Sequence, residues 1–155
     1  MKKNIYLASP FFNEKQLMIE KKVNELLELN PTVGLVFEPR LHQDTNEFAS
    51  PAWRNNTYMS DINQIRLCDV VVAVLDFASI DNEVIPDPGT VWEMGYAYAL
   101  NKPFIVVSYD KVEKLNLMIE RSYTKLFNGK EELEQLKELD FNILMPDQDR
   151  PLDMV

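Results

Sequence analysis

The sequence is poor in the residues that build metal and redox sites. Its 155 residues include one cysteine, Cys68, and one histidine, His42. An internal disulfide is therefore excluded, as are a cysteine metal cluster and a histidine-rich metal site. A Cys–His nucleophile pair would require these two residues to meet in the fold, and we interpret both as structural. We expect no metal and no cofactor.

Glycine and positive charge are scarce as well. The four glycines form neither a GxGxxG nor a Walker phosphate-binding loop. The 16 basic and 25 acidic residues give a formal charge of −9, which disfavours nucleic acid, anionic membranes and highly phosphorylated ligands. No run of apolar residues approaches the ~20 that a membrane span needs. These absences predict a cytoplasmic protein whose partners are small molecules, with no nucleic acid and no membrane.

Apolar runs alternate with helical patterns along the whole chain. A hydrophobic content of 46% is enough for the core of a single domain over residues 1–155. Strands are predicted at residues 4–8, 34–37, 70–75, 103–108 and 141–144. Helices are expected to begin at Asn13, Thr57 and Asp87, and one more covers residues 131–139. This order predicts an α/β fold, namely a flavodoxin-like, doubly wound, five-stranded parallel sheet with helices on both faces. Ligands bind at the carboxyl ends of such strands, so we expect the loops after residues 8, 37, 75 and 108 to surround the site.

The helix expected after Asp87 holds the most informative residue of the chain. Residues 86–100, PDPGTVWEMGYAYAL, are almost wholly apolar, yet Glu93 lies in their middle. Asp87 is a good N-cap and is followed by a proline, which suits the first helical position. Gly89 and Ala97, one turn before and one turn after Glu93, leave space beside the carboxylate. Such space favours a ligand site. The alternatives are that Glu93 is solvated on an exposed stripe or pairs with a lysine.

Four segments together carry a family resemblance. They are IYLASP at residues 5–10, YMSDINQI at 58–65, DPGTVWEMGYAYALNKPFIV at 87–106 and NLM at 116–118. The chain thereby resembles the nucleoside 2-deoxyribosyltransferase family, and the D-x-G-T-x-x-E-x-G-x-A block is the most specific part. The resemblance implies a pentosyltransferase of nucleoside salvage that moves 2-deoxyribose between nucleobases through a covalent glycosyl–glutamate intermediate, with retention. It also implies a homo-oligomer with active sites shared between subunits, and deoxynucleosides and free nucleobases as partners.

The resemblance assigns three residues to catalysis. Glu93 matches the nucleophile that attacks the anomeric carbon, a role suited to a carboxylate beside an oxocarbenium-like centre. Asp61 matches the residue that contacts the base and can protonate it, which requires a raised pKa. Tyr6 matches a tyrosine whose hydroxyl group orients the nucleophile. The alternatives are that Asp61 is a solvated helix residue and that Tyr6 only packs in the core.

The same resemblance assigns residues to substrate binding. Asp87 matches the residue that binds the sugar hydroxyls, and Asn116 matches one that a neighbouring subunit lends to the 5′-hydroxyl. Gln43, in a long irregular loop, corresponds to a base contact, and Ser9 and Gly89 are expected near the sugar. Asp87 and Asn116 can equally be read as helix caps. The last residues, PLDMV, lack the terminal aromatic of the family pattern, which leaves open whether the terminal carboxylate contacts the base.

Three other functions are compatible with parts of the sequence. An N-glycosidase of 2′-deoxynucleoside 5′-monophosphates would use Glu93 with water, but its phosphate site needs positive charge that a −9 chain disfavours. A non-catalytic nucleoside-sensing module would keep the pocket and tolerate loss of Glu93. A phosphoacceptor signalling domain is suggested by VVVAVLD, which ends in Asp76, but Ser9-Pro10-Phe11 stand where such domains need a pair of acids.

Overall fold

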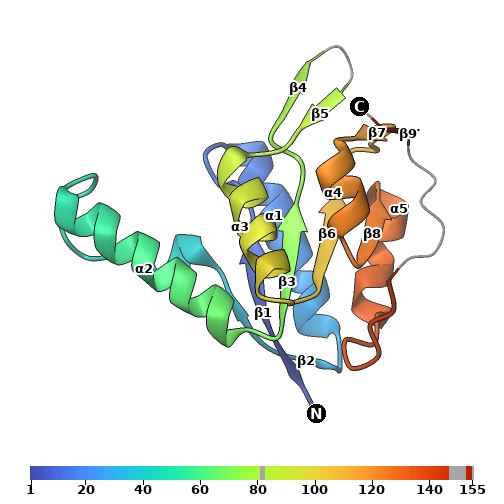
Figure 1. Cartoon of the computed structure of the whole chain (residues 1–155), viewed down its shortest axis with the longest axis horizontal. Coiled ribbons are helices and arrows are strands. Elements are labelled where there is room, and N and C mark those ends of the chain that lie inside the picture. The colour runs from blue at the N-terminus through green and yellow to red at the C-terminus, as the bar shows by residue number, and fades with distance from the viewer. Residues whose placement is uncertain (81–82, 147–152, 155) are drawn as a thin grey trace.

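The computed structural model describes residues 1–80, 83–146 and 153–154, and its centre is a five-stranded parallel sheet (Figure 1). The strand order is β2-β1-β3-β6-β8, with every neighbouring pair parallel. The strands are β1 (Lys3–Ala8), β2 (Val33–Phe37), β3 (Val70–Val74), β6 (Phe104–Ser108) and β8 (Lys125–Asn128). The two central strands β3 and β6 are buried along their whole length, because helices cover both faces of the sheet. The predicted doubly wound five-stranded sheet is confirmed.

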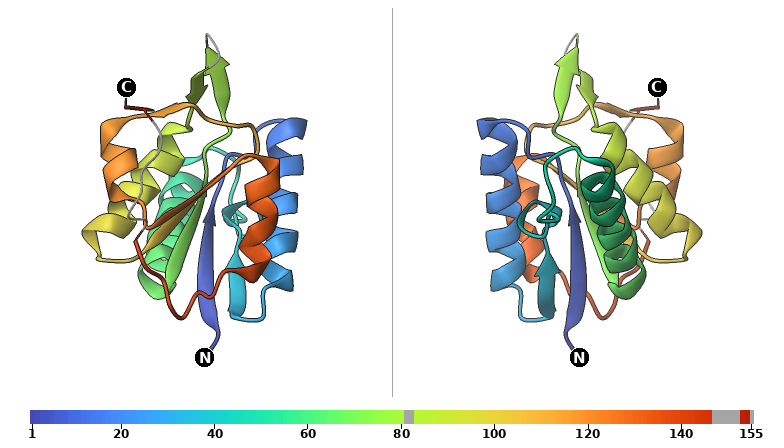
Figure 2. Two further views of the ribbon diagram at one scale, coloured as in Figure 1. Left: turned by 90° about the vertical axis from the view of Figure 1, so that its right-hand side faces the viewer. Right: turned by 90° about the vertical axis from the view of Figure 1, so that its left-hand side faces the viewer.

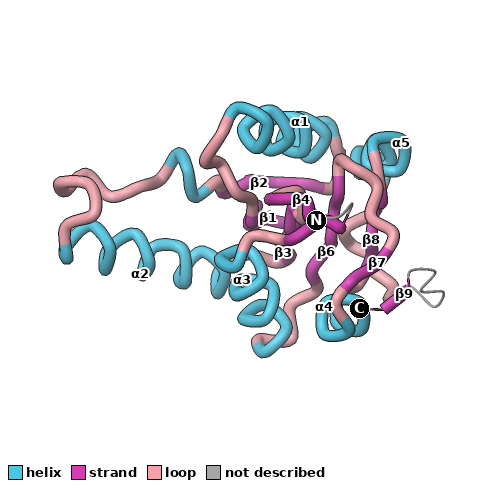
Figure 3. Tube along the Cα trace, turned by 90° about the horizontal axis from the view of Figure 1, so that it is seen from above, coloured by secondary structure: helices cyan, strands magenta, loops and turns pink. Residues whose placement is uncertain are grey.

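The helices form two layers, one on each face of the sheet (Figures 2 and 3). One layer holds α1 (Glu14–Leu29) and α5 (Lys130–Leu133), which continues as a 3-10 helix over Glu134–Glu138. The other layer holds α2 (Pro51–Leu67), α3 (Pro88–Ala99) and α4 (Leu117–Ser122). Each layer encloses its own group of buried apolar residues against the sheet. In the described part of the chain, no helix is long and apolar enough to cross a membrane.

The fifth strand does not lie where the sequence pattern placed it. Residues 141–144 form a turn and an extended segment, in which Asn142 N donates to Asp140 Oδ1 (2.9 Å). Phe141 is buried and anchors this segment to the α1 layer of the core. The strand at the sheet edge is instead β8, whose sequence KLFN has only two apolar residues and gives a weak pattern. The helix predicted over residues 131–139 is divided into α5 and the 3-10 helix.

The second helix begins earlier than predicted. Ser50 is its N-cap, with its Oγ accepting from Trp53 N (3.2 Å), and Pro51 occupies the first helical position. This Ser-Pro pair satisfies the preferences of a helix start better than Thr57 does. Thr57 lies inside the helix, where its Oγ1 accepts from Asp44 N (3.4 Å). The irregular loop is therefore shorter than expected, and a 3-10 turn at Pro39–Leu41 interrupts it.

Two features project from the sheet core. Helix α2 extends far beyond it, and among its residues only Ile62 and Ile65, toward its carboxyl end, are buried (Figure 1). The hairpin of β4 (Ala78–Ile80) and β5 (Glu83–Ile85) rises beyond the carboxyl ends of the strands. Two short strands, β7 (Lys114–Leu115) and β9 (Asp153–Met154), pair beside α4.

Candidate active site

Glu93 on α3 and Tyr6 on β1 meet on the α3 side of the sheet. The Tyr6 hydroxyl donates a hydrogen bond to Glu93 Oε1 at 2.6 Å. The Tyr6 side chain is fully buried, and its ring stacks on Phe37 of the neighbouring strand with 5.7 Å between ring centroids. Within the described residues, no group donates to Glu93 Oε2. A rigid tyrosine therefore fixes one carboxylate oxygen and leaves the other available.

The surroundings of Glu93 favour its protonated form. Burial raises the pKa of the Glu93 carboxyl to about 7, and the charges of Asp61 and Asp87 act in the same direction. The hydrogen bond from Tyr6 opposes this shift and lowers the pKa. Burial and the charge of Glu93 raise the pKa of Tyr6, so its hydroxyl stays protonated and remains a donor. At neutral pH, Glu93 is thus present in comparable fractions as the protonated acid and as the carboxylate.

A cavity of about 300 Å³ opens beside Glu93, between α2 and α3. Its walls comprise Tyr58, Asp61, Ile62, Ile65, Gly89, Trp92 and Glu93. Burial raises the pKa of the Asp61 carboxyl to about 6. Two carboxyl groups that exchange protons near neutral pH therefore face one mostly apolar cavity. One of them can act as a nucleophile when ionised, and the other can act as an acid when protonated.

Asp87 and Gly89 form the first turn of α3. Asp87 caps the helix, and its Oδ2 accepts from Thr90 N (2.8 Å) and Thr90 Oγ1 (3.2 Å). A Cβ at position 89 would lie 2.9 Å from Asp87 Oδ2, so glycine allows the cap to form. No donor in the described ranges reaches Asp87 Oδ1, which leaves this oxygen for a ligand. Asp87 can therefore cap the helix and bind a ligand at the same time.

Five expected site residues are not among the walls of this cavity, namely Tyr6 and Asp87, described above, and Ser9, Gln43 and Asn116. Ser9 is buried and its Oγ donates to Pro10 O (3.1 Å). Gln43 lies partly exposed in the loop before α2. Asn116 is exposed and caps α4, with Oδ1 accepting from Met118 N (2.9 Å). The fold of one chain thus joins Tyr6 to Glu93 and places Asp61, Gly89 and Glu93 on one cavity, while Ser9, Gln43 and Asn116 are not among its walls.

Two aromatic residues of the cavity were not predicted as site residues. Tyr58 and Trp92 are 53% and 48% exposed and line the cavity. Their rings lie 6.1 Å apart in an edge-to-face arrangement. The sequence does contain a signal, because Tyr58 precedes Asp61 by one helical turn and Trp92 directly precedes Glu93.

The loops after residues 75 and 108 do not border this cavity. They line a separate one of about 410 Å³ on the α1 side, together with Asn13 and Lys15. The expectation that all four loops surround one site therefore stays a prediction. The nucleophile candidate lies on the face of α3 that meets β1.

Residues capable of metal binding are dispersed in the described part of the chain. Nowhere in it do three His, Cys, Asp or Glu side chains gather as a metal site would need. Cys68 is buried, its Sγ donates to Ile65 O (3.2 Å), and burial raises the pKa of the thiol to about 11. His42 stacks on Phe37 with 4.4 Å between ring centroids. The residue carrying the terminal carboxylate, Val155, lies outside the described residues.

Comparison with known proteins identifies the family of this chain. The family model described as nucleoside 2-deoxyribosyltransferase matches residues 5–152. This chain belongs to the nucleoside 2-deoxyribosyltransferase family. The nucleoside deoxyribosyltransferase of Limosilactobacillus fermentum is 34% identical over 151 residues, which cover 89% of this chain and 86% of that protein. Membership makes the chain a pentosyltransferase enzyme.

Solved structures agree with the deoxyribosyltransferase assignment. The 2-deoxyribosyltransferase of Bacillus psychrosaccharolyticus superposes with a TM-score of 0.77 at 33% identity, covering 93% of this chain and 98% of that one. A CMP N-glycosidase from Clostridium botulinum superposes with a TM-score of 0.54 at 22% identity, covering 91% of this chain and 100% of that one. At that identity the second likeness shows a shared fold only.

Proposed function

We propose that this protein transfers a 2-deoxyribosyl group from one nucleobase to another through an ester on Glu93, with retention at the anomeric carbon. One observation carries the proposal. The carboxylate of Glu93 lines a cavity of about 300 Å³ with two aromatic side chains, has one oxygen held by Tyr6, and shares the cavity with a second carboxyl group, Asp61. Family membership supplies the reaction class.

In the first half-reaction, Glu93 Oε2 attacks C1′ of the donor nucleoside. The C1′–N bond breaks, its electron pair stays on the base nitrogen, and Asp61 donates a proton to the departing base. A glycosyl ester on Glu93 and a neutral free base result. Burial keeps the pKa of Asp61 at about 6, so a useful fraction of this carboxyl group carries the proton near neutral pH.

In the second half-reaction, a nitrogen of the acceptor base attacks C1′ from the face that the first base left. The ester C–O bond breaks, its electrons return to the Glu93 carboxylate, and Asp61 takes the proton of the incoming base. Each half-reaction inverts the anomeric carbon, so two of them restore its configuration. Because the enzyme returns to its starting protonation state, no cofactor is consumed.

The apolar walls favour this chemistry over a reaction in open water. Tyr58 and Trp92 present flat aromatic surfaces on which a nucleobase can stack, while Ile62 and Ile65 exclude water from the carboxylates. Gly89 lines the cavity and allows the Asp87 cap to form, and the free Oδ1 of Asp87 is suited to accept a hydrogen bond from a sugar hydroxyl. Gln43 and Ser9 remain proposed contacts near the base and the sugar.

The active form is proposed to be a homo-oligomer that completes each site with residues of a neighbour. Large apolar side chains are exposed on the projecting α2, the loop before it and α3, among them Phe48 (76%) and Tyr98 (60%). Large exposed apolar side chains are typical of surfaces that are covered in an assembly. Asn116, which lies exposed at the start of α4, is proposed to reach the 5′-hydroxyl in a neighbouring subunit's site.

A base-exchange assay tests the proposal. Deoxyinosine is incubated with free adenine, and the products are separated by chromatography. We expect deoxyadenosine and hypoxanthine from the wild-type enzyme and neither from Glu93→Ala. Glu131→Ala, an exposed position on the opposite helix layer, is the matched control and should keep full activity. Free deoxyribose without deoxyadenosine would instead indicate a hydrolase, and binding without products would indicate a sensing module.

A further inference from the structure

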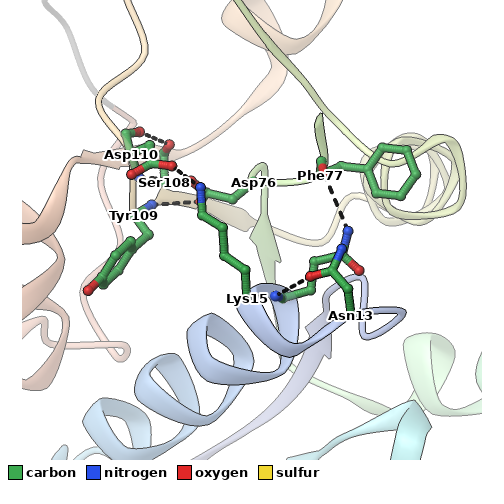
Figure 4. A network of polar contacts seen from close by, with 8 residues as sticks. Asn13, Lys15, Asp76, Phe77, Ser108, Tyr109 and Asp110 are labelled. Carbon is green, nitrogen blue, oxygen red and sulfur yellow. Dashed lines mark hydrogen bonds and ion pairs between the residues drawn. The ribbon is translucent and has the colours of Figure 1, made fainter. Parts of the chain in front are cut away.

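Asp76 joins the ends of two central strands. It follows β3 and is only 7% exposed. Its Oδ2 accepts from Tyr109 N (2.6 Å) and its Oδ1 accepts from Asp110 N (2.8 Å), so both oxygens hold the chain just after β6 (Figure 4). Ser108 Oγ also donates to Asp110 O.

The same segment is held at its other end by Asn128. Val112 N donates to Asn128 Oδ1 and Asn128 Nδ2 donates to Val112 O, both at 2.8 Å. Residues 109–112 are therefore fixed at two points before the chain enters β7. Asn116 follows Val112 by four residues, so this segment leads through β7 to the start of α4.

The chemistry of the first anchor requires a carboxylate. Two adjacent backbone N–H groups need two acceptor atoms, which an aspartate supplies and an asparagine does not. Burial raises the pKa of Asp76, while the hydrogen bonds from Asp110 N and Tyr109 N act in the opposite direction. A buried carboxylate is costly to keep, so its retention suggests a task other than packing. The exposed ion pair between Lys15 and Asp110 touches the same segment from outside.

We propose that Asp76 is a positioning residue that sets the place of Asn116, and through it the recognition of the sugar 5′-hydroxyl. This inference rests on the proposed function, in which Asn116 binds that hydroxyl in a neighbouring subunit's site. Asp76 itself touches no substrate. Its effect is confined to the part of the substrate that Asn116 contacts, so it acts on substrate preference and not on the chemical step at C1′.

The test compares two donors that differ only in the 5′-hydroxyl, a 2′-deoxynucleoside and the matching 2′,5′-dideoxynucleoside. The measured quantity is the ratio of their kcat/KM values in the wild type, Asp76→Asn, Asn116→Ala and the double variant. We expect Asn116→Ala to lower this preference about tenfold, the value of one lost hydrogen bond. Asp76→Asn should remove most of the same preference through a higher KM for the 5′-hydroxylated donor. The double variant should lose no more than Asn116→Ala alone.

A control and a milder variant accompany this test. Lys15→Met removes the exposed ion pair but leaves both hydrogen bonds of Asp76, and it should keep the wild-type preference. Asn128→Asp keeps the acceptor for Val112 N–H and loses the donor, so it should lower the preference in the same direction by less. If Asp76→Asn does not fold, Asn128→Asp tests the positioning role in its place.

The outcomes separate the two proposals. If Asn116→Ala lowers the preference while Asp76→Asn and Asn128→Asp keep it, the positioning role is wrong and the proposed function stands. If Asn116→Ala leaves the preference unchanged, the assigned role of Asn116 is wrong and the positioning role falls with it. A general loss of activity toward both donors in Asp76→Asn, with an unchanged ratio, also contradicts the positioning role.

Discussion

The hydroxyl group of Tyr6 and the carboxylate of Glu93 lie 2.6 Å apart although 87 positions separate them in the chain. One residue is fixed in a central strand and the other on the helix that packs over it. The contact selects which carboxylate oxygen is free to react, and it lowers the pKa of a carboxyl group that burial raises. Several expected outcomes depend on this contact.

Tyr6→Phe should impair the chemical step more than substrate binding. The substitution removes a hydrogen bond to a charged group, so kcat should fall by about 10- to 100-fold with a smaller change in KM. Because the hydrogen bond lowers the pKa of Glu93, its loss should also move the acidic limb of the pH–rate profile to higher pH. Steady-state kinetics across the pH range measure both effects. An unchanged acidic limb would show that Tyr6 does not act on the nucleophile.

Glu93→Gln should stabilise the folded protein at alkaline pH. The folded-state pKa of about 7 lies above the ordinary value of 4.5, so Glu93 favours folding fully below pH 4.5 and loses this contribution as the pH rises to 7. Glutamine does not titrate. The variant should therefore gain between about 1 and 3 kcal/mol relative to the wild type from about pH 5 to about pH 8.

Urea denaturation at the two pH values measures this difference. Asp61→Asn should show the same trend, with the change complete nearer pH 6 because the pKa of Asp61 is raised to about 6. If the wild type and Glu93→Gln keep a constant difference at both pH values, Glu93 is not buried in the way the structure shows.

Asp61→Asn should slow only the reactions in which the leaving base needs a proton. An amide cannot donate a proton as a carboxylic acid does, so kcat/KM for deoxyinosine should fall by about 10²- to 10⁴-fold. N7-methylated deoxyguanosine carries a base that departs without protonation, and for this donor the loss should stay below about tenfold. Equal losses for both donors would assign Asp61 to binding and not to proton transfer.

The exposed apolar side chains of α2, of the loop before it and of α3 should support assembly of the homo-oligomer. Phe48→Glu and Tyr98→Glu place a charge on two of the most exposed aromatic positions among them and should dissociate the oligomer. Leu29→Glu makes a similar change on α1, on the opposite face of the sheet, and should leave assembly unchanged. Light scattering coupled to size-exclusion chromatography measures the mass.

Activity provides the second readout of this surface. If sites are shared between subunits, the dissociated variants should lose transferase activity and regain it at high protein concentration. Full activity of a dissociated Phe48→Glu monomer would contradict the shared site.

The parts of the fold that could be predicted from the sequence are those with strong local patterns. Strands β3 and β6 are buried on both sides and therefore read as continuous apolar runs. The start of α3 follows from Asp87 and the proline after it. Strand β8 was missed because an edge strand with two apolar residues resembles a loop, and the apolar residues 141–144 were mistaken for it.

The candidate site likewise has residues that could be predicted from the sequence and residues that could not. Tyr6, Asp61 and Glu93 were assigned by the family resemblance, and the structure joins Tyr6 to Glu93 and places Asp61 on the same cavity. The exposure of Trp92 could not be predicted, because an aromatic residue on an apolar helix is normally expected in the core. Only the structure shows that α2 projects away from the sheet and leaves Trp92 exposed on α3. The location of Asn116 relative to a substrate depends on a second subunit, and no pattern within one chain specifies it.

Peptide mass spectrometry shows whether the glycosyl ester forms on Glu93. The wild-type enzyme is mixed with a deoxynucleoside donor in the absence of an acceptor base, quenched in acid and digested. We expect a mass increase of one 2-deoxyribosyl group on the peptide that contains Glu93, its disappearance when an acceptor base is added, and no adduct on Glu93→Ala. Transfer products formed without an adduct, or with the adduct on another residue, would contradict the ester on Glu93.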